Sequence, residues 1–178
     1  KVFVVDNMIN GKKKIKSKNI KYYKFSYDNS KVIKIINKNN IKNIYHLAGF
    51  IDSEESVLKP KKYFKNNVHR MERFLKSLTS KTDQKINIYF ASSAAVYGAT
   101  SIKKIKETQK CKPISPYGYS KLLGEKLLHK FSKKNISYIS FRFFNVAGAD
   151  KKINHGPENK NYKHLLNKIQ NVKNNFVI

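Results

Sequence analysis

Short apolar runs alternate along this chain with longer segments in which apolar residues recur at every third or fourth position. The short runs cover residues 2–5, 20–25, 43–49, 86–91, 138–144 and 176–178. Runs of this length that are apolar almost throughout are typical of strands buried on both faces of a parallel sheet. The pattern therefore predicts a strand in each of these segments.

The longer segments between the runs carry helical periodicity. We predict helices over residues 28–39, 60–78 and 162–172, and another that begins at Ser115-Pro116, an N-cap followed by a first helical position. Strands that alternate with helices of this length favour an α/β fold with a doubly wound parallel sheet of the Rossmann type. Asp6, Gly49 and Ser93 would then lie at carboxyl ends of strands, where ligands bind in such sheets.

The composition sets outer bounds. With 178 residues, 40% of them hydrophobic, the chain can form one domain with a sizeable core. Cys111 is the only cysteine, which excludes an internal disulfide and a cysteine zinc site and fits a reducing compartment. No signal peptide or membrane-spanning run is evident, so we expect a cytoplasmic protein without a membrane partner or metal site. Because the chain starts at Lys1 and enters a strand at once, we expect it to be part of a longer protein.

The net charge of +27 suggests nucleic acid or another anionic partner. The charge comes almost entirely from lysines, spread along the chain beside abundant Asn and Ile, as the codon bias of an AT-rich genome produces. The lysine cluster at residues 11–18 is either a nucleic-acid patch or a solvated loop, and we favour the loop because no nucleic-acid module accompanies it. We therefore predict no specific nucleic-acid partner, although such a field would attract a small anionic substrate.

The candidate chemistry lies in a serine and a tyrosine–lysine pair. Tyr117 and Lys121 are four residues apart in a predicted helix, so their side chains would project from one face. An ammonium beside a phenol favours phenolate and lowers the tyrosine pKa toward working pH, which suits Tyr117 to take a proton from an alcohol. Ser93 would hydrogen-bond the same substrate oxygen. In a chain with 11 tyrosines this pair also arises by chance, so its context must carry the case.

That context is a collinear set of motifs. They are Asp6-Asn7, His46-Leu47-Ala48-Gly49, Glu55-Ser56-Val57, Lys59-Pro60, Asn66-Asn67-Val68, and residues 92–98, 115–121 and 142–149. Together they resemble the extended short-chain dehydrogenase/reductase superfamily of NAD-dependent epimerases and dehydratases, and within it the UDP-glucose 4-epimerase family. The resemblance covers nearly the whole chain. It implies that residues 1–150 are a partial NAD-binding domain of the Rossmann type and residues 151–178 the start of a substrate-binding portion.

The resemblance also implies an activity, which is 4-epimerisation of a UDP-sugar through a transient 4-keto intermediate, with NAD as the cofactor and a homodimer as one assembly. The implied catalytic residues are Ser93, Tyr117 and Lys121. The implied cofactor-binding residues are Asp6, Asn7, Leu47, Ala48, Gly49, Asn66, Ser92, Tyr117, Lys121 and Phe144. The implied substrate-binding residues are Ser93, Tyr117, Asn145 and His164. On residue chemistry alone, a helix or turn cap is the favoured interpretation of Asp6, and His46 is better interpreted as a packed or hydrogen-bonded histidine than as a ligand.

Departures from the family pattern keep alternatives open. Ala94-Ala95 stand where related 4,6-dehydratases carry an acidic pair, which favours epimerisation, of this sugar or of uronic acids and N-acetyl sugars. The family's Gly-rich loop, with its first strand-loop-helix unit, does not occur in the sequence, nor does most of the C-terminal substrate domain. Phe25 stands where the family commonly has an adenine-binding Asp, and Ile51 where Lys is common. A non-catalytic relative that acts as a binding protein is therefore a second hypothesis.

Overall fold

The structure, a computed structural model, describes residues 1–10, 17–101, 104–132 and 135–146. The chain divides into two compact units, Lys1–Arg142 and Phe143–Ile178. Most of the second unit lies outside the described residues. The helix predicted over residues 162–172, the strand predicted over 176–178 and the domain boundary predicted after residue 150 also lie there, and they stay predictions.

Five strands form within the described residues, close to the predicted apolar runs. β1 (Val2–Val5) pairs in parallel with β2 (Ile20–Tyr23). β3 (Asn43–His46) pairs in parallel with β4 (Ile86–Ser93), with His46 opposite Phe90, and β5 (Ile136–Phe143) is the next strand beside β4. The strands thus make one two-stranded and one three-stranded sheet. Helices connect the consecutive strands of the larger sheet, which confirms the predicted α/β class of Rossmann type.

The helices predicted within the described residues form, with one irregular turn. α1 (Lys31–Lys38) and α5 (Pro116–Phe131) occupy their predicted segments. The segment that begins at Pro60 is α3 (Pro60–Tyr63), then a π-helical turn, η1 (Phe64–His69), then α4 (Arg70–Lys81). Two short elements go beyond the prediction, α2 (Ser53–Leu58) and the 3₁₀ turn η2 (Ala94–Tyr97). None of the described helices is both long and apolar enough to span a membrane.

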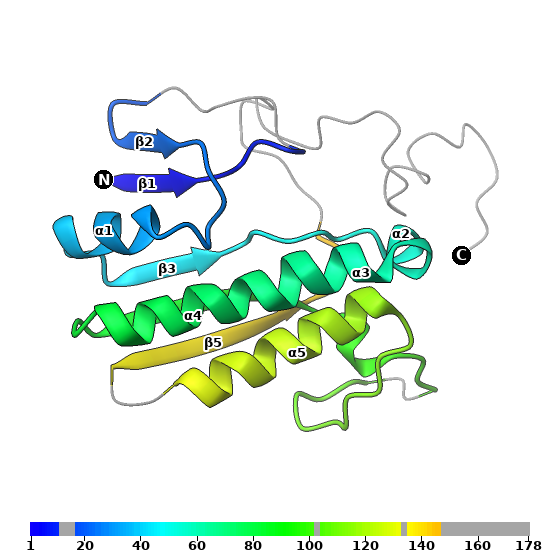
Figure 1. Cartoon of the computed structure of the whole chain (residues 1–178). Helices are drawn as coiled ribbons and strands as arrows, with labels where there is room; N and C mark the ends of the chain where they lie inside the picture. Colours follow the sequence, from blue (N-terminus) through cyan, green and yellow to red (C-terminus); the bar gives the residue numbers. More distant parts are fainter. Residues whose placement is uncertain (11–16, 102–103, 133–134, 147–178) are drawn as a thin grey trace. The chain divides into compact units, whose positions relative to one another are not determined.

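The core lies between the helices and the larger sheet. α4 and α5 run side by side across β5 and its neighbours, and α1 packs against α4 (Figure 1). The buried residues that form this core are Val32, Ile33, Ile36, Met71, Phe74, Leu75, Leu78, Ile86, Ile88, Phe90, Leu128 and Ile136. Burying each such side chain fully contributes about 1.5–3 kcal/mol, so the packing fixes β4 against α5. The candidate site is built where β4 ends and α5 begins.

Candidate active site

Ser93 ends β4 and caps the turn that follows. Its backbone is extended, with φ −151° and ψ 148°, and its Oγ accepts a hydrogen bond of 3.2 Å from the N–H of Ala95, the second residue of η2. A hydroxyl oxygen that accepts from the backbone still has its own O–H to donate. Ser93 therefore lies at the predicted carboxyl end of its strand, with a fixed oxygen and a hydrogen to offer.

Tyr117 and Lys121 lie on the first turns of α5. Ser115 caps this helix, because its Oγ accepts from the Gly118 N–H, and Pro116 occupies the first turn. The Tyr117 N–H donates to the Ser56 Oγ at 3.1 Å, which ties the start of α5 to α2. The Lys121 Nζ lies 5.9 Å from the centre of the Tyr117 ring, so the predicted pairing of the two side chains is present.

The Lys121 ammonium is buried, with 4% of the residue exposed. Its Nζ donates to the Ala91 carbonyl at 2.7 Å, two residues before Ser93, and lies 5.1 Å from the centre of the Phe90 ring. Burial lowers the Lys121 pKa from 10.5 to about 8. The described residues make no second hydrogen bond to this ammonium, so two of its three N–H donors are available to a bound molecule.

Gly118 allows α5 to approach the serine turn closely. A Cβ at this position would lie 2.6 Å from the Ala95 carbonyl oxygen and 3.1 Å from the Pro113 Cβ. Real Cβ atoms do not come so near a backbone oxygen, so a side chain there would push the helix away. The glycine thus sets the distance between the helix that carries Tyr117 and the turn that Ser93 caps.

The π-helical turn η1 buries two asparagine amides under the same site. The Asn67 amide accepts from the Phe50 N–H at 2.9 Å and donates to the Phe50 carbonyl at 3.0 Å and to the Ser120 Oγ at 3.0 Å. Asn66 donates to the Asn67 Oδ1 at 3.1 Å. A Cβ on Gly49 would lie 3.3 Å from the Asn67 Oδ1 and 3.4 Å from the Lys121 Nζ. The predicted residue Gly49 therefore lies beside Lys121, the predicted residue Asn66 bonds to Asn67, and Asn67 fastens the loop after Gly49.

The other predicted residues at strand ends are more exposed. Asp6 accepts from the Met8 N–H at 2.7 Å and Asn7 from the Ile9 N–H at 3.2 Å, so both cap the turn after β1, as the simpler interpretation of Asp6 expects. Leu47 and Ala48 follow β3 with exposed side chains, and Leu47 is 68% exposed. An apolar residue so exposed at the ligand-binding edge of a sheet is available to cover a bound molecule.

The remaining predicted site residues are Ser92, Phe144, Asn145 and His164. Ser92 is buried and its Oγ donates to the Glu125 Oε1 at 2.5 Å, so its hydroxyl points to α5. Phe144 and Asn145 are exposed and belong to the second unit. His164 lies outside the described residues. The cofactor role of Ser92 and Phe144 and the substrate role of Asn145 and His164 stay predictions.

His46 is packed among aromatic rings. Its ring centre lies 4.7 Å from that of Tyr27, 5.7 Å from that of Phe90 and 6.2 Å from that of Phe74. Within the described residues neither ring nitrogen has a hydrogen-bond partner. Burial, and then the charge of Lys121, lower the His46 pKa to about 4, so the ring is neutral at pH 7. The interpretation of His46 as packed is confirmed.

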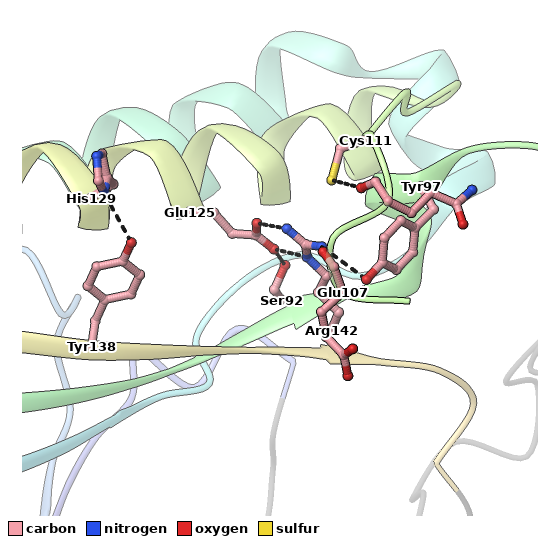
Figure 2. Close-up of polar contacts among 9 residues, drawn as sticks. Ser92, Tyr97, Glu107, Cys111, Glu125, His129, Tyr138 and Arg142 are labelled. Atoms are coloured by element: carbon pink, nitrogen blue, oxygen red, sulfur yellow. Dashed lines mark hydrogen bonds and ion pairs between the residues drawn. The ribbon is translucent and has the colours of Figure 1, made fainter. Parts of the chain in front are cut away.

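An ion pair that sequence reasoning missed lies behind the serine turn. The Arg142 guanidinium on β5 donates to both Glu125 carboxylate oxygens, at 3.1 and 2.8 Å, and also to the Tyr97 hydroxyl at 2.9 Å (Figure 2). Arg142 belongs to a quoted motif, but the partner, Glu125, has only one local signal, its position four residues after Lys121 on the same helix face.

Comparison with known proteins gives the family. The sequence profile of the NAD dependent epimerase/dehydratase family matches residues 1–178. A UDP-glucose 4-epimerase of Lactobacillus helveticus is 33% identical over 171 residues, which are 94% of this chain and 51% of that protein. The chain thus spans about half the length of the curated relatives it matches.

Solved structures agree. A crystal structure of a UDP-glucose 4-epimerase superposes with a TM-score of 0.76 at 32% identity, covering 83% of this chain and 45% of that one. The UDP-glucose 4-epimerase of Brucella ovis, in complex with NAD, gives a TM-score of 0.73 at 28% identity over 83% and 45%. The fold class and the family resemblance predicted from the sequence are confirmed, and the chain belongs to the NAD-dependent epimerase/dehydratase family.

Proposed function

We propose that the protein catalyses NAD-dependent 4-epimerisation of a UDP-sugar, such as the interconversion of UDP-glucose and UDP-galactose, through a 4-keto intermediate. The observation that carries the proposal is the place of Lys121, whose Nζ lies 5.9 Å from the centre of the Tyr117 ring and donates to the Ala91 carbonyl, two residues before Ser93. The names of the relatives support the substrate class.

The three side chains have separate tasks. Tyr117, as phenolate, takes the proton from the hydroxyl on sugar carbon 4 and later returns it. Lys121 favours the phenolate by its positive charge, because the ammonium lies beside the ring and is shielded from water. Ser93 donates its O–H to the same sugar oxygen, since its own oxygen is held by the Ala95 N–H.

The residues fit a bound NAD at one well-defined point. The Lys121 ammonium is buried and has donors left, which suits it to the hydroxyls of a nicotinamide ribose. When bound, NAD would supply the reversible hydride acceptor that oxidation and re-reduction at sugar carbon 4 require. Leu47, Ala48 and Gly49 would lie along the cofactor, and Asp6 would receive the adenosine ribose.

The residues of the serine turn favour epimerisation over dehydration of the sugar. Ala94 and Ala95 hold no proton, so the acid and base that dehydration of the sugar requires are missing at these two positions. Epimerisation needs only the one base that Tyr117 provides. Asn145 and His164 remain the proposed contacts to the nucleotide portion, and a homodimer remains the proposed assembly.

The test is turnover by the complete gene product. With NAD present, it should convert UDP-galactose to UDP-glucose, followed by ¹H NMR of the anomeric protons. Tyr117→Phe should lower kcat by about 10²- to 10⁴-fold, since it removes a general base. The matched control is Tyr119→Phe, two residues along the same helix with a half-exposed ring, which should leave kcat unchanged. Full activity in Tyr117→Phe, or no turnover in the parent, would contradict the proposal.

One observation favours a second candidate, a non-catalytic binding protein. Phe25 packs against the hydrophobic core at the position where the resemblance expects an adenine-binding aspartate. Loss of that carboxylate weakens cofactor anchoring. Purification of the complete gene product with NAD bound at about one per chain, measured by absorbance after acid release, would argue against this candidate. Nucleotide-free protein that also fails to bind added NAD would favour it.

A further inference from the structure

Glu125 and Arg142 connect five separate parts of the fold, which are α5, β5, the end of β4, the turn η2 and the loop that holds Glu107. Glu125 lies on α5 and Arg142 on β5, and their side chains are 12% and 22% exposed. Besides both carboxylate oxygens, the guanidinium donates to the Tyr97 hydroxyl and to the Glu107 carbonyl, each at 2.9 Å. The carboxylate accepts a third hydrogen bond from the Ser92 Oγ at 2.5 Å. Figure 2 shows these groups converging on the guanidinium.

The pair holds the chain on both sides of Ser93. Ser92 is the residue before it and is bound by Glu125, whereas Tyr97 ends the turn that Ser93 begins and is bound by Arg142. The Arg142 Cζ also lies 4.9 Å from the centre of the Tyr97 ring. The five-residue stretch from Ser93 to Tyr97 is therefore fastened at its two ends by one ion pair.

The Glu125 carboxylate lies on the same helix as Tyr117, the proposed base. Tyr117, Lys121 and Glu125 recur at four-residue steps on α5, so Glu125 stands one turn beyond Lys121 on the same helix face. A hydrogen bond from Ser92 to Glu125 consequently links the end of β4 to the helix that carries Tyr117. Any slip of the strand end along α5 would break this bond first.

We propose that Glu125 and Arg142 are positioning residues, which keep the Ser93 hydroxyl in register with the Tyr117 phenol. The inference rests on the proposed function, because it gives the register a catalytic purpose. A two-pronged contact of Arg with a carboxylate fixes direction as well as distance, which a single lysine contact does not. The hydrogen bonds that Arg142 donates to Glu125 raise the Arg142 pKa above its already high ordinary value, so the guanidinium is charged at every working pH.

The alternative is that the pair merely stabilises the fold. Partly buried ion pairs contribute little net stability, because desolvation offsets most of the attraction. The guanidinium makes four hydrogen bonds to three residues, and the pair as a whole contacts Ser92 and Tyr97, which flank or end the turn that Ser93 caps; this is more than global stability requires. If the pair positions Ser93, its loss should increase amide exchange mainly in the serine turn. If it stabilises the whole fold, exchange should increase throughout the sheet, and hydrogen exchange distinguishes the two without any substrate.

The first experiment follows single amides in Glu125→Gln by hydrogen exchange and NMR. Glutamine keeps the size but turns an N–H₂ toward the Arg142 donors. The amides of Ala95, bound to the Ser93 Oγ, and Gly98, bound to the Ala95 carbonyl, should exchange at least about tenfold faster. The amides of Ile86 and Asn87, bound at the far end of β4, should stay within about twofold.

The matched control is Asp28→Asn. Asp28 forms the other arginine–carboxylate pair with two nitrogen contacts, to Arg73, and that pair is remote from the serine turn in its bonding partners. This variant should leave the Ala95 and Gly98 amides unchanged. Equal acceleration of all four amides in Glu125→Gln, or acceleration of none, would overturn the proposal. If Glu125→Gln does not fold, the same four amides are followed in Tyr97→Phe, which removes only the hydrogen bond from Arg142 to the Tyr97 hydroxyl. If neither variant folds, the pair stabilises the whole fold, and the positioning proposal is overturned.

The second experiment measures turnover in the complete gene product. Glu125→Gln and Arg142→Lys should lower kcat by about 10- to 100-fold, with KM changed less than about threefold, because the groups are displaced and not removed. In a Ser93→Ala background the same substitution should cost much less, since the residue it positions is gone. If the substitution lowers kcat by the same factor in the Ser93→Ala background as in the parent, the proposal is overturned. A parent without turnover would instead contradict the proposed function, while the exchange result still decides the positioning role.

Discussion

At the scale of the residue, Lys121 must be charged for its proposed role, but burial of its ammonium lowers the free energy of unfolding. The unfolded chain keeps this lysine protonated up to about pH 10.5, whereas the folded protein releases the proton at about pH 8. Between these two values the unfolded state binds more protons, so the free energy of unfolding rises with pH across this window. Below pH 8 the full cost of the buried ammonium is present.

This cost can be measured with Lys121→Met. The free energy of unfolding of the parent, minus that of the variant, should increase by on the order of 1–3 kcal/mol between pH 7 and pH 10. Urea unfolding at both pH values gives the difference. Lys126→Met removes an exposed lysine from the same helix and serves as the control, with no such increase expected. Parallel pH profiles for the parent and Lys121→Met would contradict the burial argument.

His46 gives a slope of the same sign in a more acidic window. Its pKa falls from 6.5 to about 4 on folding, so the unfolded state takes up a proton that the folded protein refuses, and stability is lost as the pH falls from 6.5 to 4. His46→Phe retains the aromatic packing and should remove up to about 3 kcal/mol of this acid-side loss. Unfolding at pH 7 and pH 4.5 measures it. The exposed His69→Gln should keep the loss, and an unaltered loss in His46→Phe would show that the ring can be charged in place.

At the scale of the element, the register of α5 against the serine turn depends on Gly118. Alanine is the better helix former by about 1 kcal/mol, yet its Cβ would meet the Ala95 carbonyl oxygen at 2.6 Å. We expect Gly118→Ala to lower the free energy of unfolding by about 1–3 kcal/mol, the usual effect of overpacking. Gly124→Ala is the graded comparison, because its Cβ meets the ring end of Phe90 at 2.8 Å, which can shift. A Gly118→Ala variant as stable as the parent would show that the close approach is not required.

The elements that the sequence predicts are those with apolar periodicity. α1, α5 and the strands follow it closely, but β2 and β3 end two and three residues early, at Tyr23 and His46. α2 has one buried residue, Ser56, and therefore no hydrophobic stripe; its only signal is the local cap of Asp52 on the Glu55 N–H. The π-turn η1 buries Asn67 against Phe50 and Ser120, 17 and 53 residues away, and no local pattern contains those distances.

At the scale of the whole molecule, the candidate site also has a part that the sequence predicts and a part that it does not. Ser93, Tyr117 and Lys121 could be predicted because strand ends and helix faces are periodic properties. The Glu125–Arg142 pair could not, because the pair and its partners come from five parts of the fold and many charged residues of the chain are candidates for such a pair. Family motifs named Arg142, and only the packed structure identified what it holds.

The net charge of +27 acts on ligands from a distance and leads to a further prediction. A basic surface raises the local concentration of anions, and the effect is screened as the Debye length falls from about 10 Å at 0.1 M salt to about 3 Å at 1 M. We expect the Kd of UDP for the complete gene product, measured by calorimetry, to rise by at least about tenfold between 50 and 500 mM NaCl. Uridine has the same base and sugar without the charge, and its Kd should stay within about twofold. A UDP affinity that is insensitive to salt would mean that neighbouring side chains, and not the field of the lysines, provide the attraction. Mixed-sequence duplex DNA should bind no more tightly than it binds an unrelated lysine-rich protein at the same salt, because the lysines supply charge without a groove-reading element.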